Sequence, residues 1–421
     1  MELKKYKLGE LGKVITGKTP KTSKKENFDN GVIPFYTPED IARGIGITGK
    51  NERFITEIGL SEIKNNSLED ESVLVGCIGS DMGNVAYTNH RCAMNQQINA
   101  ITSFKDYICP LYVYYYLSTK KQEFRKIAGA TTTPILPKSV FCDYIILLPK
   151  YHIQRKIASV LYNIDRKIEI NRAINQNLEA MAKQLYDYWF VQFDFPNEEG
   201  KPYKSSGGKM VWNEKLKREI PEGWSNMSIG DYAPCKSGYA FKSKDFGNTG
   251  LPVIKIGNIQ ENYTLDMTDS QRIDLFSKTM FLAKRFDLVI AMTGATIGKF
   301  AISQRNYWVN QRVGRFDLGD SPLLRLGFLF NSLKQEYFRE QIFQIACGCA
   351  QPNISSEQID SILILKPNNT VLNQFNKICE PLLKLQSENY LQIEELTKQR
   401  DELLPLLMNG QVSVNSDLSA H

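Results

Sequence analysis

Residues 79–96 read GSDMGNVAYTNHRCAMNQ, and residues 294–311 read GATIGKFAISQRNYWVNQ. Both stretches open with two glycines separated by three residues, and both close with Asn-Gln at the same distance from the start. The two copies lie about half a chain apart, whereas solenoid repeats recur every 20–50 residues or so. The pattern therefore indicates one domain that is used twice.

The repeat extends to both sides of this stretch. The matched positions are glycines, prolines and the apolar residues beside them. In the first copy they include Gly9, Gly17, Pro34, Gly129 and Pro134, and in the second copy Gly230, Gly238, Pro252, Gly348 and Pro352. Between these positions the copies agree little, which is expected when a shared scaffold carries loops that bind different ligands.

The composition is that of an ordinary globular protein. The chain has 421 residues, of which 42% are hydrophobic, so we expect about two to three domains with well-formed cores. Its eight cysteines form no CxxC pair, and no apolar run approaches the roughly 18 residues of a membrane span. We therefore expect reduced thiols, a cytoplasmic location and no membrane partner. A net charge of +6 permits a nucleic-acid partner without requiring one.

Short strands are predicted in each copy. Residues 73–78, 85–87 and 143–148 are apolar runs bounded by Gly, Asn, Asp or Pro, which is typical of strands. One helix is predicted at residues 111–126 and its counterpart at residues 323–345. Each unit should therefore have an α+β fold, with a sheet of short strands and few helices.

Each copy ends in a long helical pattern. Apolar residues recur at three- and four-residue steps from Ile153 to Trp189 and again from Leu372 to Leu407, where Asn409-Gly410 supplies a C-terminal cap. Two such helices need a partner, and we expect them to pair with each other. The residues predicted for the seam are Ile157, Ile164, Ile168, Leu178 and Leu185 on the first helix and Leu382, Leu385, Leu396 and Leu403 on the second.

Polar residues and prolines interrupt this pattern. Asn171, Asn175 and Asn389 fall on the apolar seam, where they either fix the register as buried residues or mark a seam that frays toward solvent. Pro381 and Pro405 predict kinks or a broken start in the second helix.

The resulting domain plan has six parts. Residues 197–209 are rich in Gly, Ser, Lys and Glu, the composition of a flexible connector. The boundaries are 1–150 for the first domain, 151–193 for its helix, 194–218 for the linker, 219–370 for the second domain, 371–410 for its helix and 411–421 for a tail. The expected fold is thus α+β, with two duplicated α/β domains separated by two long antiparallel coiled-coil helices.

Enzyme motifs are present only in part. Residues 12–19 match the phosphate-loop pattern, but a charged segment precedes them, Pro20 follows, and the second copy has Tyr239 and Ala240 at the matching place. Residues 44–49 match the glycine pattern of dinucleotide-binding proteins without its strand and helix, so we interpret them as a loop. No four-ligand metal spacing occurs. The chain has only three histidines, the residue that most often acts as a general acid or base. These features favour a binding protein without a catalytic centre.

Several loops carry side chains suited to DNA. Lysines cluster beside Gly17 and Gly238, where they either form a solvated surface or contact phosphates. Asn95 and Asn310 are either buried scaffold residues or readers of bases. The candidate contacts are Lys18, Lys21, Lys24, Lys25, Tyr36, Thr37, Ser80, Asp81, Thr131, Thr132 and Thr133 in the first copy, and Lys242, Lys244, Lys255, Asn258, Thr293, Thr296, Lys299, Gln351 and Asn353 in the second.

The order of domain, long helix, domain and long helix resembles the specificity (S) subunit of type I restriction-modification systems. The pieces that carry the resemblance are Glu-Ile-Pro-Glu-Gly-Trp at residues 219–224, residues 294–298 with the following Asn-Gln, residues 348–354 and residues 403–412. The first copy departs from the pattern at residues 80–82 and 131–133. The resemblance covers nearly the whole chain, with each domain in the place of a target recognition domain.

The resemblance implies a DNA-recognition subunit without chemistry of its own. Each recognition domain would read one part of a split, asymmetric target in double-stranded DNA. The helix pair would set the gap and dock two methyltransferase (M) subunits, which use S-adenosylmethionine to methylate adenine. Restriction (R) subunits would add ATP- and Mg-dependent cleavage, so this chain itself would need no cofactor. The alternatives are an anti-restriction or scaffold protein that occupies methyltransferase subunits, or a phosphate-loop ATPase or nuclease.

Overall fold

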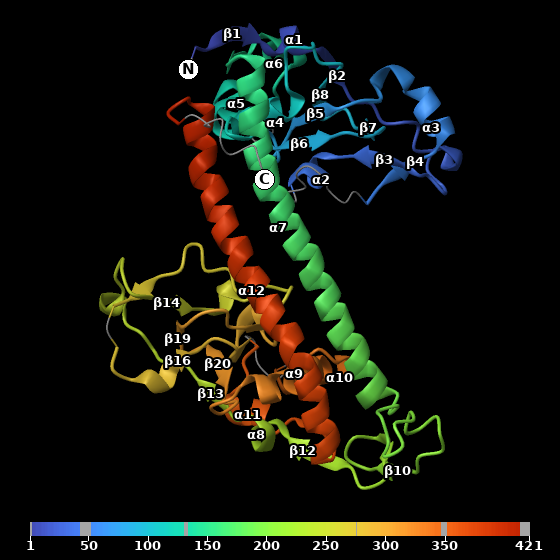
Figure 1. Ribbon diagram of the computed structural model, residues 1–421, viewed down its shortest axis with the longest axis vertical. Helices are drawn as coiled ribbons and strands as arrows, with labels where there is room; N and C mark the ends of the chain where they lie inside the picture. The colour runs from blue at the N-terminus through green and yellow to red at the C-terminus, as the bar shows by residue number, and fades with distance from the viewer. Residues whose placement is uncertain (1, 43–51, 130–133, 275, 347–351, 413–421) are drawn as a thin grey trace. The chain divides into compact units, whose positions relative to one another are not determined.

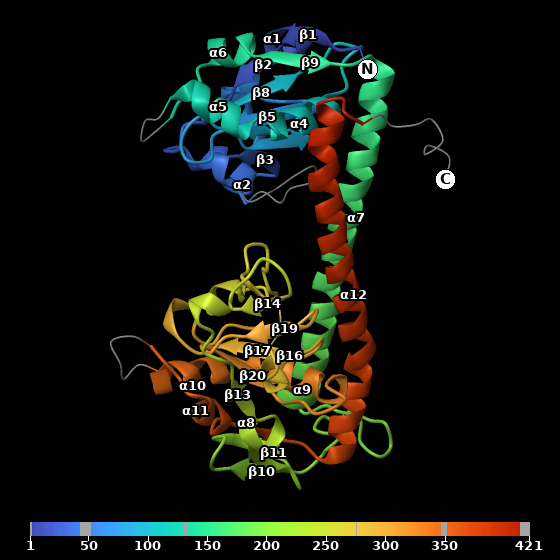
Figure 2. The same cartoon turned by 90° about the vertical axis from the view of Figure 1, so that its left-hand side faces the viewer.

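The computed structural model describes residues 2–42, 52–129, 134–274, 276–346 and 352–412 (Figures 1 and 2). Contacts divide the chain into unit 1, Met1–Ile168 with Glu395–His421, and unit 2, Glu169–Glu394. Each long helix therefore contributes one part to each unit. Among the described residues, no helix is both long and apolar enough to cross a membrane.

Unit 1 is built on a four-stranded antiparallel sheet. The strands run in the order β2 (Lys13–Thr16), β8 (Ile98–Thr102), β5 (Ser72–Gly76) and β6 (Val85–Thr88). β5 is buried along its whole length, because alternate side chains enter different cores. Val73 and Val75 pack with the tyrosines of a covering helix, whereas Leu74 packs with Tyr36 and Met94 from a second sheet.

The second sheet of unit 1 consists of β4 (Phe54–Ile55), β3 (Ile33–Tyr36) and β7 (Ala93–Met94), with β3 and β7 parallel. A separate antiparallel pair, β1 (Lys4–Lys7) and β9 (Ile145–Leu148), joins the two ends of the domain. The helical segments are α1 (Leu8–Leu11), η1 (Lys25–Asn27), α2 (Pro38–Ala42), α3 (Glu57–Glu62), η2 (Lys64–Asn66), α4 (Pro110–Ser118), α5 (Lys121–Ala128) and α6 (Lys138–Asp143).

Unit 2 repeats most of this topology, although its second sheet has four strands and that of unit 1 has three. Its central sheet has the order β13 (Cys235–Ser237), β20 (Val313–Phe316), β17 (Leu288–Ala291) and β18 (Phe300–Ile302). The second sheet has the order β15 (Arg272–Ile273), β14 (Leu251–Ile254), β19 (Tyr307–Val309) and β16 (Leu282–Ala283), again with one parallel pair, β14 and β19. β12 (Ser225–Ser228) and β21 (Leu363–Lys366) form the pair that joins the domain ends. The predicted duplication and the α+β fold are confirmed.

Unit 2 also has helical segments between and after its strands. They are α8 (Ile229–Tyr232), η4 (Ser243–Asp245), η5 (Ile256–Asn258), η6 (Thr279–Phe281), η7 (Gly294–Thr296), α9 (Leu323–Leu333), α10 (Glu336–Ala346) and α11 (Ser356–Asp360). The prediction of a single helix at residues 111–126 and 323–345 is wrong, because each copy has two helices there. In unit 1, Ser118 and Thr119 donate side-chain hydrogen bonds to the carbonyls of Tyr115 and Tyr116, both at 2.7 Å, and such bonds compete with helix continuation.

The two long helices are α7 (Tyr151–Tyr186), which ends in a π-helical turn, η3 (Asp187–Val191), and α12 (Asn369–Met408). α12 runs unbroken through Pro381 and Pro405, so the predicted broken start is wrong. It ends before Gly410, whose φ of 70° provides the predicted cap.

Hydrogen bonds show that α7 and α12 pair antiparallel. Within unit 2, Asn171 Nδ2 donates to Gln392 Oε1 at 3.1 Å, and Asn389 Nδ2 donates to Asn175 Oδ1 at 2.9 Å. Asn175 Nδ2 in turn donates to the Gln386 carbonyl at 3.2 Å. Asn175 and Asn389 are 3% and 5% exposed, so they are buried polar residues in the helix pair and not a frayed end.

The predicted seam residues occupy different environments. Ile157 is buried in the domain core of unit 1, and Ile168 and Leu178 are also buried. Ile164, Leu185, Leu382, Leu396 and Leu403 are half-buried. Leu385 was wrongly assigned, since its side chain is 44% exposed and the neighbouring Leu383 is buried instead. A period of three to four residues leaves such adjacent positions ambiguous.

The segment between the repeats is folded, contrary to the predicted flexible connector. β10 (Met210–Asn213) and β11 (Arg218–Pro221) form a hairpin. Phe195 stacks on both Tyr203 and Trp224, with ring centroids 4.7 Å apart in each pair. Aromatic residues scattered through a polar segment thus hold it against the core of unit 2.

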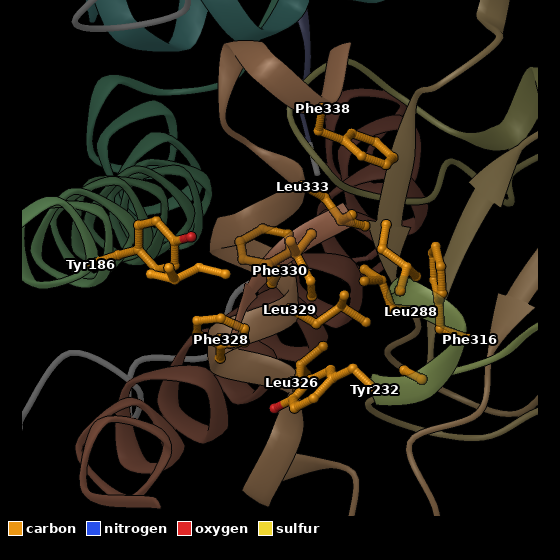
Figure 3. Close-up of a cluster of buried hydrophobic side chains, with 14 of the residues drawn as sticks. Tyr186, Tyr232, Leu288, Phe316, Leu326, Phe328, Leu329, Phe330, Leu333 and Phe338 are labelled. Carbon is orange, nitrogen blue, oxygen red and sulfur yellow. The ribbon is translucent and has the colours of Figure 1, made fainter. Parts of the chain in front are cut away.

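An aromatic cluster joins the helices of unit 2 to its domain (Figure 3). Tyr186 extends from α7 to Phe328 of α9, with ring centroids 5.9 Å apart. Phe375 of α12 lies 4.9 Å from Phe190 and 5.8 Å from Trp189. Because these rings are fully or almost fully buried, the cluster fixes this domain on its part of the helix pair.

Candidate DNA-binding surface

The Asn-Gln segment forms the same tight turn in both units. The amide of Ile98 donates to the carbonyl of Asn95 at 3.2 Å, and the amide of Val313 donates to that of Asn310 at 2.9 Å. The side chain of Asn95 bonds to the backbone and side chain of Gln97, both at 3.0 Å. Asn95 is therefore a scaffold residue and not a free reader of bases.

The first glycine of each glycine loop is hydrogen-bonded to the carbonyl of the matched proline. The amide of Gly79 donates to the Pro134 carbonyl at 3.1 Å, and that of Gly294 donates to the Pro352 carbonyl at 3.0 Å. Both glycines have positive φ, 87° and 73°, a conformation that favours glycine. Two residues before each of these glycines a backbone amide donates to the turn: Cys77 to the Gln97 carbonyl at 2.8 Å, and Met292 to the Arg312 carbonyl at 3.0 Å.

The basic loops start against the same turn. A Cβ atom on Gly17 would lie 2.1 Å from the Asn95 carbonyl oxygen, and one on Gly238 would lie 2.3 Å from the Asn310 carbonyl oxygen. Only glycine allows this approach. In each unit the start of the basic loop, the glycine loop and the turn are thus brought together, and they form the candidate surface.

Replacing Gly238 by Ala should destabilise unit 2 by at least about 1–3 kcal/mol, because the added methyl group meets backbone that cannot move away. The chain's four tryptophans all lie in unit 2, so denaturation followed by tryptophan fluorescence reports on this unit. Gly257→Ala is the matched control, since no atom lies within 4 Å of its Cβ position. Equal midpoints for the two variants would contradict the close approach.

Lysines of the first basic loop are exposed, but not all are free. Lys24 Nζ lies 2.6 Å from Glu62 of α3, and this hydrogen bond lowers the pKa of Glu62. The same carboxylate accepts the Lys21 amide at 3.2 Å. Among the described residues, no ion pair holds Lys18 or Lys25. Glu62 therefore shapes the loop, while the remaining lysines keep their charges available.

In the second basic loop, Lys242 and Lys244 are exposed. The backbone amide of Lys242 donates to Asp245 at 2.7 Å, and among the described residues no ion pair holds its ammonium group. Lys236, at the start of this loop, is paired with Asp317. The two basic loops thus combine anchored and available lysines in similar ways.

Tyr36 and Thr37 were predicted as DNA contacts, but the structure buries both side chains. Both are 5% exposed; the Tyr36 hydroxyl lies 3.0 Å from His90 Nε2, and Thr37 Oγ1 donates to Asp40 at 2.8 Å. Burial raises the pKa of Tyr36 to about 12. Tyr36 is the last residue of β3 and Thr37 follows it, and the alternation of a four-residue strand did not reveal that both are covered.

Lys255 and Asn258 occupy the equivalent segment of unit 2, and their side chains already have hydrogen-bond partners. Asn258 Oδ1 accepts the Lys255 amide at 2.7 Å, and its Nδ2 donates to the Asp266 carbonyl at 2.8 Å, so the amide group serves the fold. Lys255 Nζ bonds to Gln271 and lies 4.9 Å from the Phe246 ring centroid. The charge of Lys255 remains at the surface, whereas Asn258 is not a free contact.

Side chains of the glycine loops reach the surface to different extents. Ser80 is exposed, Asp81, Thr293 and Thr296 are half-buried, and Lys299 Nζ lies 3.2 Å from Glu261. Asn353 is exposed beside Thr293, with which it forms a β-bridge. The candidates Thr131, Thr132, Thr133 and Gln351, and the glycine pattern at residues 44–49, lie outside the described residues.

Two arginines of this surface were not among the predicted contacts. Arg125 of α5 donates to the carbonyl of Ser80 and so supports the first glycine loop. Arg312 is exposed on the turn of unit 2, where a polar cavity of about 260 Å³ is lined by Thr293, Gln311 and Asn353. Arg312 occupies the position of Gln97 in the first copy. Because the two residues differ, a search for residues shared by the copies did not select Arg312.

The phosphate-loop match does not have phosphate-loop geometry. Residues 13–16 of the motif form strand β2, paired with β8, and Thr19 Oγ1 donates to Gln96 at 2.8 Å. The next helical segment is the short η1 and not a helix that follows the motif directly. Across the part of the chain that the structure describes, no cluster of His, Cys, Asp or Glu could hold a metal ion.

Comparisons with known proteins assign this architecture to a family. The family model of the type I restriction modification DNA specificity domain matches residues 1–180 and 221–389, and the chain belongs to this family. It is thus a specificity subunit of a type I restriction-modification system, the non-catalytic kind of subunit that recognises DNA together with modification and restriction subunits.

Similar proteins span almost the whole chain. The MjaIX specificity subunit of Methanocaldococcus jannaschii is 28% identical over 415 residues, which cover 97% of this chain and 93% of the relative. The MjaVIII specificity subunit of the same organism is 25% identical with the same coverage, 97% and 93%. The crystal structure of the S subunit from M. genitalium has a TM-score of 0.66 and 15% identity, covering 97% of this chain and 96% of that one, and so shares the fold.

Proposed function

We propose that this chain reads a bipartite, asymmetric target in double-stranded DNA, with one half-site for each unit. The observation that carries the proposal is the repeated surface on which different side chains are displayed. In both units a basic loop and a glycine loop meet the Asn-Gln turn through the same backbone hydrogen bonds. The positions beside these bonds differ, with Lys18 in unit 1 where unit 2 has Tyr239. Two unlike surfaces on one scaffold should select two unlike sequences.

The helix pair is proposed to set the gap between the half-sites. α7 has 36 residues and α12 has 40, so each is long on the scale of a DNA turn of about 34 Å. The buried bonds between Asn175 and Asn389 favour one register, because any sliding of the helices would leave buried amides without partners. A fixed register would give a fixed gap.

The chain is also proposed to dock two methyltransferase subunits, with restriction subunits joining the complex. S-adenosylmethionine, ATP and Mg would then be bound by those partners and not by this chain. The alternative of an anti-restriction or scaffold protein is not favoured, since such a protein would need no basic loops at the repeated surface.

The proposal is tested by mapping methylated adenines in cells that contain the methyltransferase subunit, with and without this chain. We expect one motif that depends on the chain and consists of two different half-sites separated by a constant number of unspecified base pairs. A continuous motif, or methylation that does not depend on the chain, would refute the bipartite reading.

Replacing Lys24 and Lys25 by Ala should weaken binding to all DNA sequences and make its salt dependence shallower. Each lost phosphate contact should lower the slope of log K against log salt by about 1. Lys24 can exchange its Glu62 partner for a DNA phosphate at little cost in free energy, because an exposed ion pair stabilises by only about 0–1 kcal/mol. Lys209→Ala, outside the basic loops and beside Glu222, is the control. A loss confined to the specific target would instead make this loop a base reader.

A further inference from the structure

The turn at residues 310–313 holds its tip rigidly but leaves its side chains free. The Gln311 amide donates to the Tyr239 carbonyl at 2.9 Å, and the Arg312 carbonyl accepts the Met292 amide at 3.0 Å. Both side chains are exposed, and within the described ranges no hydrogen bond or ion pair holds either of them. A fixed backbone that presents an unbonded guanidinium is suited to recognition, because little conformational freedom is lost on binding.

The matching turn of unit 1 is different. Its two tip residues are Gln96 and Gln97, and both are bonded internally. Gln96 Oε1 accepts from Thr19 Oγ1 at 2.8 Å, and Gln97 Oε1 accepts from Asn95 Nδ2 at 3.0 Å. The free arginine is therefore a property of unit 2 and not of the shared scaffold.

The surroundings of Arg312 favour a base over a phosphate. The cavity of about 260 Å³ beside it is lined by hydroxyl and amide groups from Ser237, Thr293, Gln311 and Asn353, and by the carboxylate of Glu357. Glu357 is exposed, and among the described residues it forms no ion pair with Arg312. A carboxylate at this place repels a phosphate, whereas base edges are neutral and offer both donors and acceptors.

We propose that Arg312 reads a guanine in the half-site of unit 2, donating two hydrogen bonds to O6 and N7 through its planar guanidinium. This pairing is the commonest specific contact between an arginine and a base edge. The inference rests on the proposed function, in that unit 2 must read one half of the target. It adds the identity of the base and the residue that selects it.

The test compares Arg312→Gln and Arg312→Lys in the full chain assembled with its methyltransferase subunit. Methylation rates are measured on the mapped target and on duplexes in which each G·C pair of the second half-site is replaced in turn. For the native chain, one replacement should reduce methylation by about 5- to 150-fold. Arg312→Gln should lose this discrimination at that one position, whereas Arg312→Lys, whose ammonium group can also donate to O6 and N7 but without the planar fork, should keep only part of it.

Lys244→Ala is the control from the same unit, because it should weaken all duplexes equally without altering any preference. Tryptophan fluorescence verifies that unit 2 is folded in every variant. The inference is overturned if the second half-site contains no G·C pair, if both Arg312 variants keep the native preference, or if Arg312→Gln weakens all duplexes equally as a phosphate contact would. A target without two half-sites would refute the proposed function itself, whatever the variants do.

Discussion

Lengthening both long helices by one heptad is expected to widen the gap between the half-sites by about three base pairs. Seven helical residues add about 10 Å, and the rise of B-form DNA is about 3.4 Å per base pair. The recognition loops lie outside the altered segments, so both half-site sequences should stay the same. Methylated-adenine mapping with the lengthened chain measures the gap directly.

The hydrogen bonds between the helices define where the heptads belong. One heptad is inserted between Asn171 and Asn175 of α7, and the other between Asn389 and Gln392 of α12. Asn171 then keeps Gln392 as its partner, and Asn175 keeps Asn389. The heptad inserted in α7 alone is the control, because it takes these pairs out of register. An unchanged gap with an altered half-site, in a doubly lengthened chain that binds its methyltransferase subunits, would refute the helix pair as the spacer.

Replacing Phe375 by Ala should lower the free energy of unfolding of unit 2 by about 3–5 kcal/mol. Phe375 is fully buried and lies between Tyr186, Trp189 and Phe190, with the nearest ring centroid at 4.9 Å. The cavity left behind would be enclosed by rings on two helices, which cannot collapse onto it without moving. Denaturation followed by tryptophan fluorescence reports this loss, because all four tryptophans lie in unit 2.

Ile378→Ala, one turn along the same helix, is the matched control. Its side chain is 45% exposed, so removing it should change stability by only about 0.5 kcal/mol. If the two variants unfolded at the same denaturant concentration, the aromatic cluster would not be the element that fixes this domain on the helices.

The duplicated fold was predictable because the repeat is marked by positions with strict steric demands. Gly17 and Gly238 lie too close to backbone oxygens for any side chain, and Gly79 and Gly294 adopt positive φ. Such residues survive at fixed spacing while surface residues vary. The same reasoning located the long helices, whose apolar period and glycine cap are strong signals.

The errors arose where several arrangements share one pattern. A helical period does not separate Leu383, which is buried, from Leu385, which is exposed. A polar composition suggested a flexible connector at residues 197–209, but the stacking of Phe195 on Tyr203 and Trp224 orders this region. Strand ends such as Tyr36 carry no signal for which face is covered by the second sheet.

The candidate contacts were predictable as loops but not as individual side chains. Whether Asn258 or Asn353 is free depends on local partners that only the fold reveals. Arg312 was missed because it lies between matched positions, where the copies differ. In a protein that reads two different sequences, those unmatched positions are where specificity should be sought.

The claim that each unit reads its own half-site is tested most directly by giving the chain the same domain twice. The end pairs Lys4 with Leu148 and Ser225 with Lys366 mark equivalent boundaries, so residues 4–148 can replace residues 225–366. Assembly with the methyltransferase subunit and a cooperative unfolding transition verify that the hybrid is folded. Methylated-adenine mapping should then show a target with the half-site of unit 1 on both sides of the gap. Retention of the original second half-site by this hybrid would contradict the account.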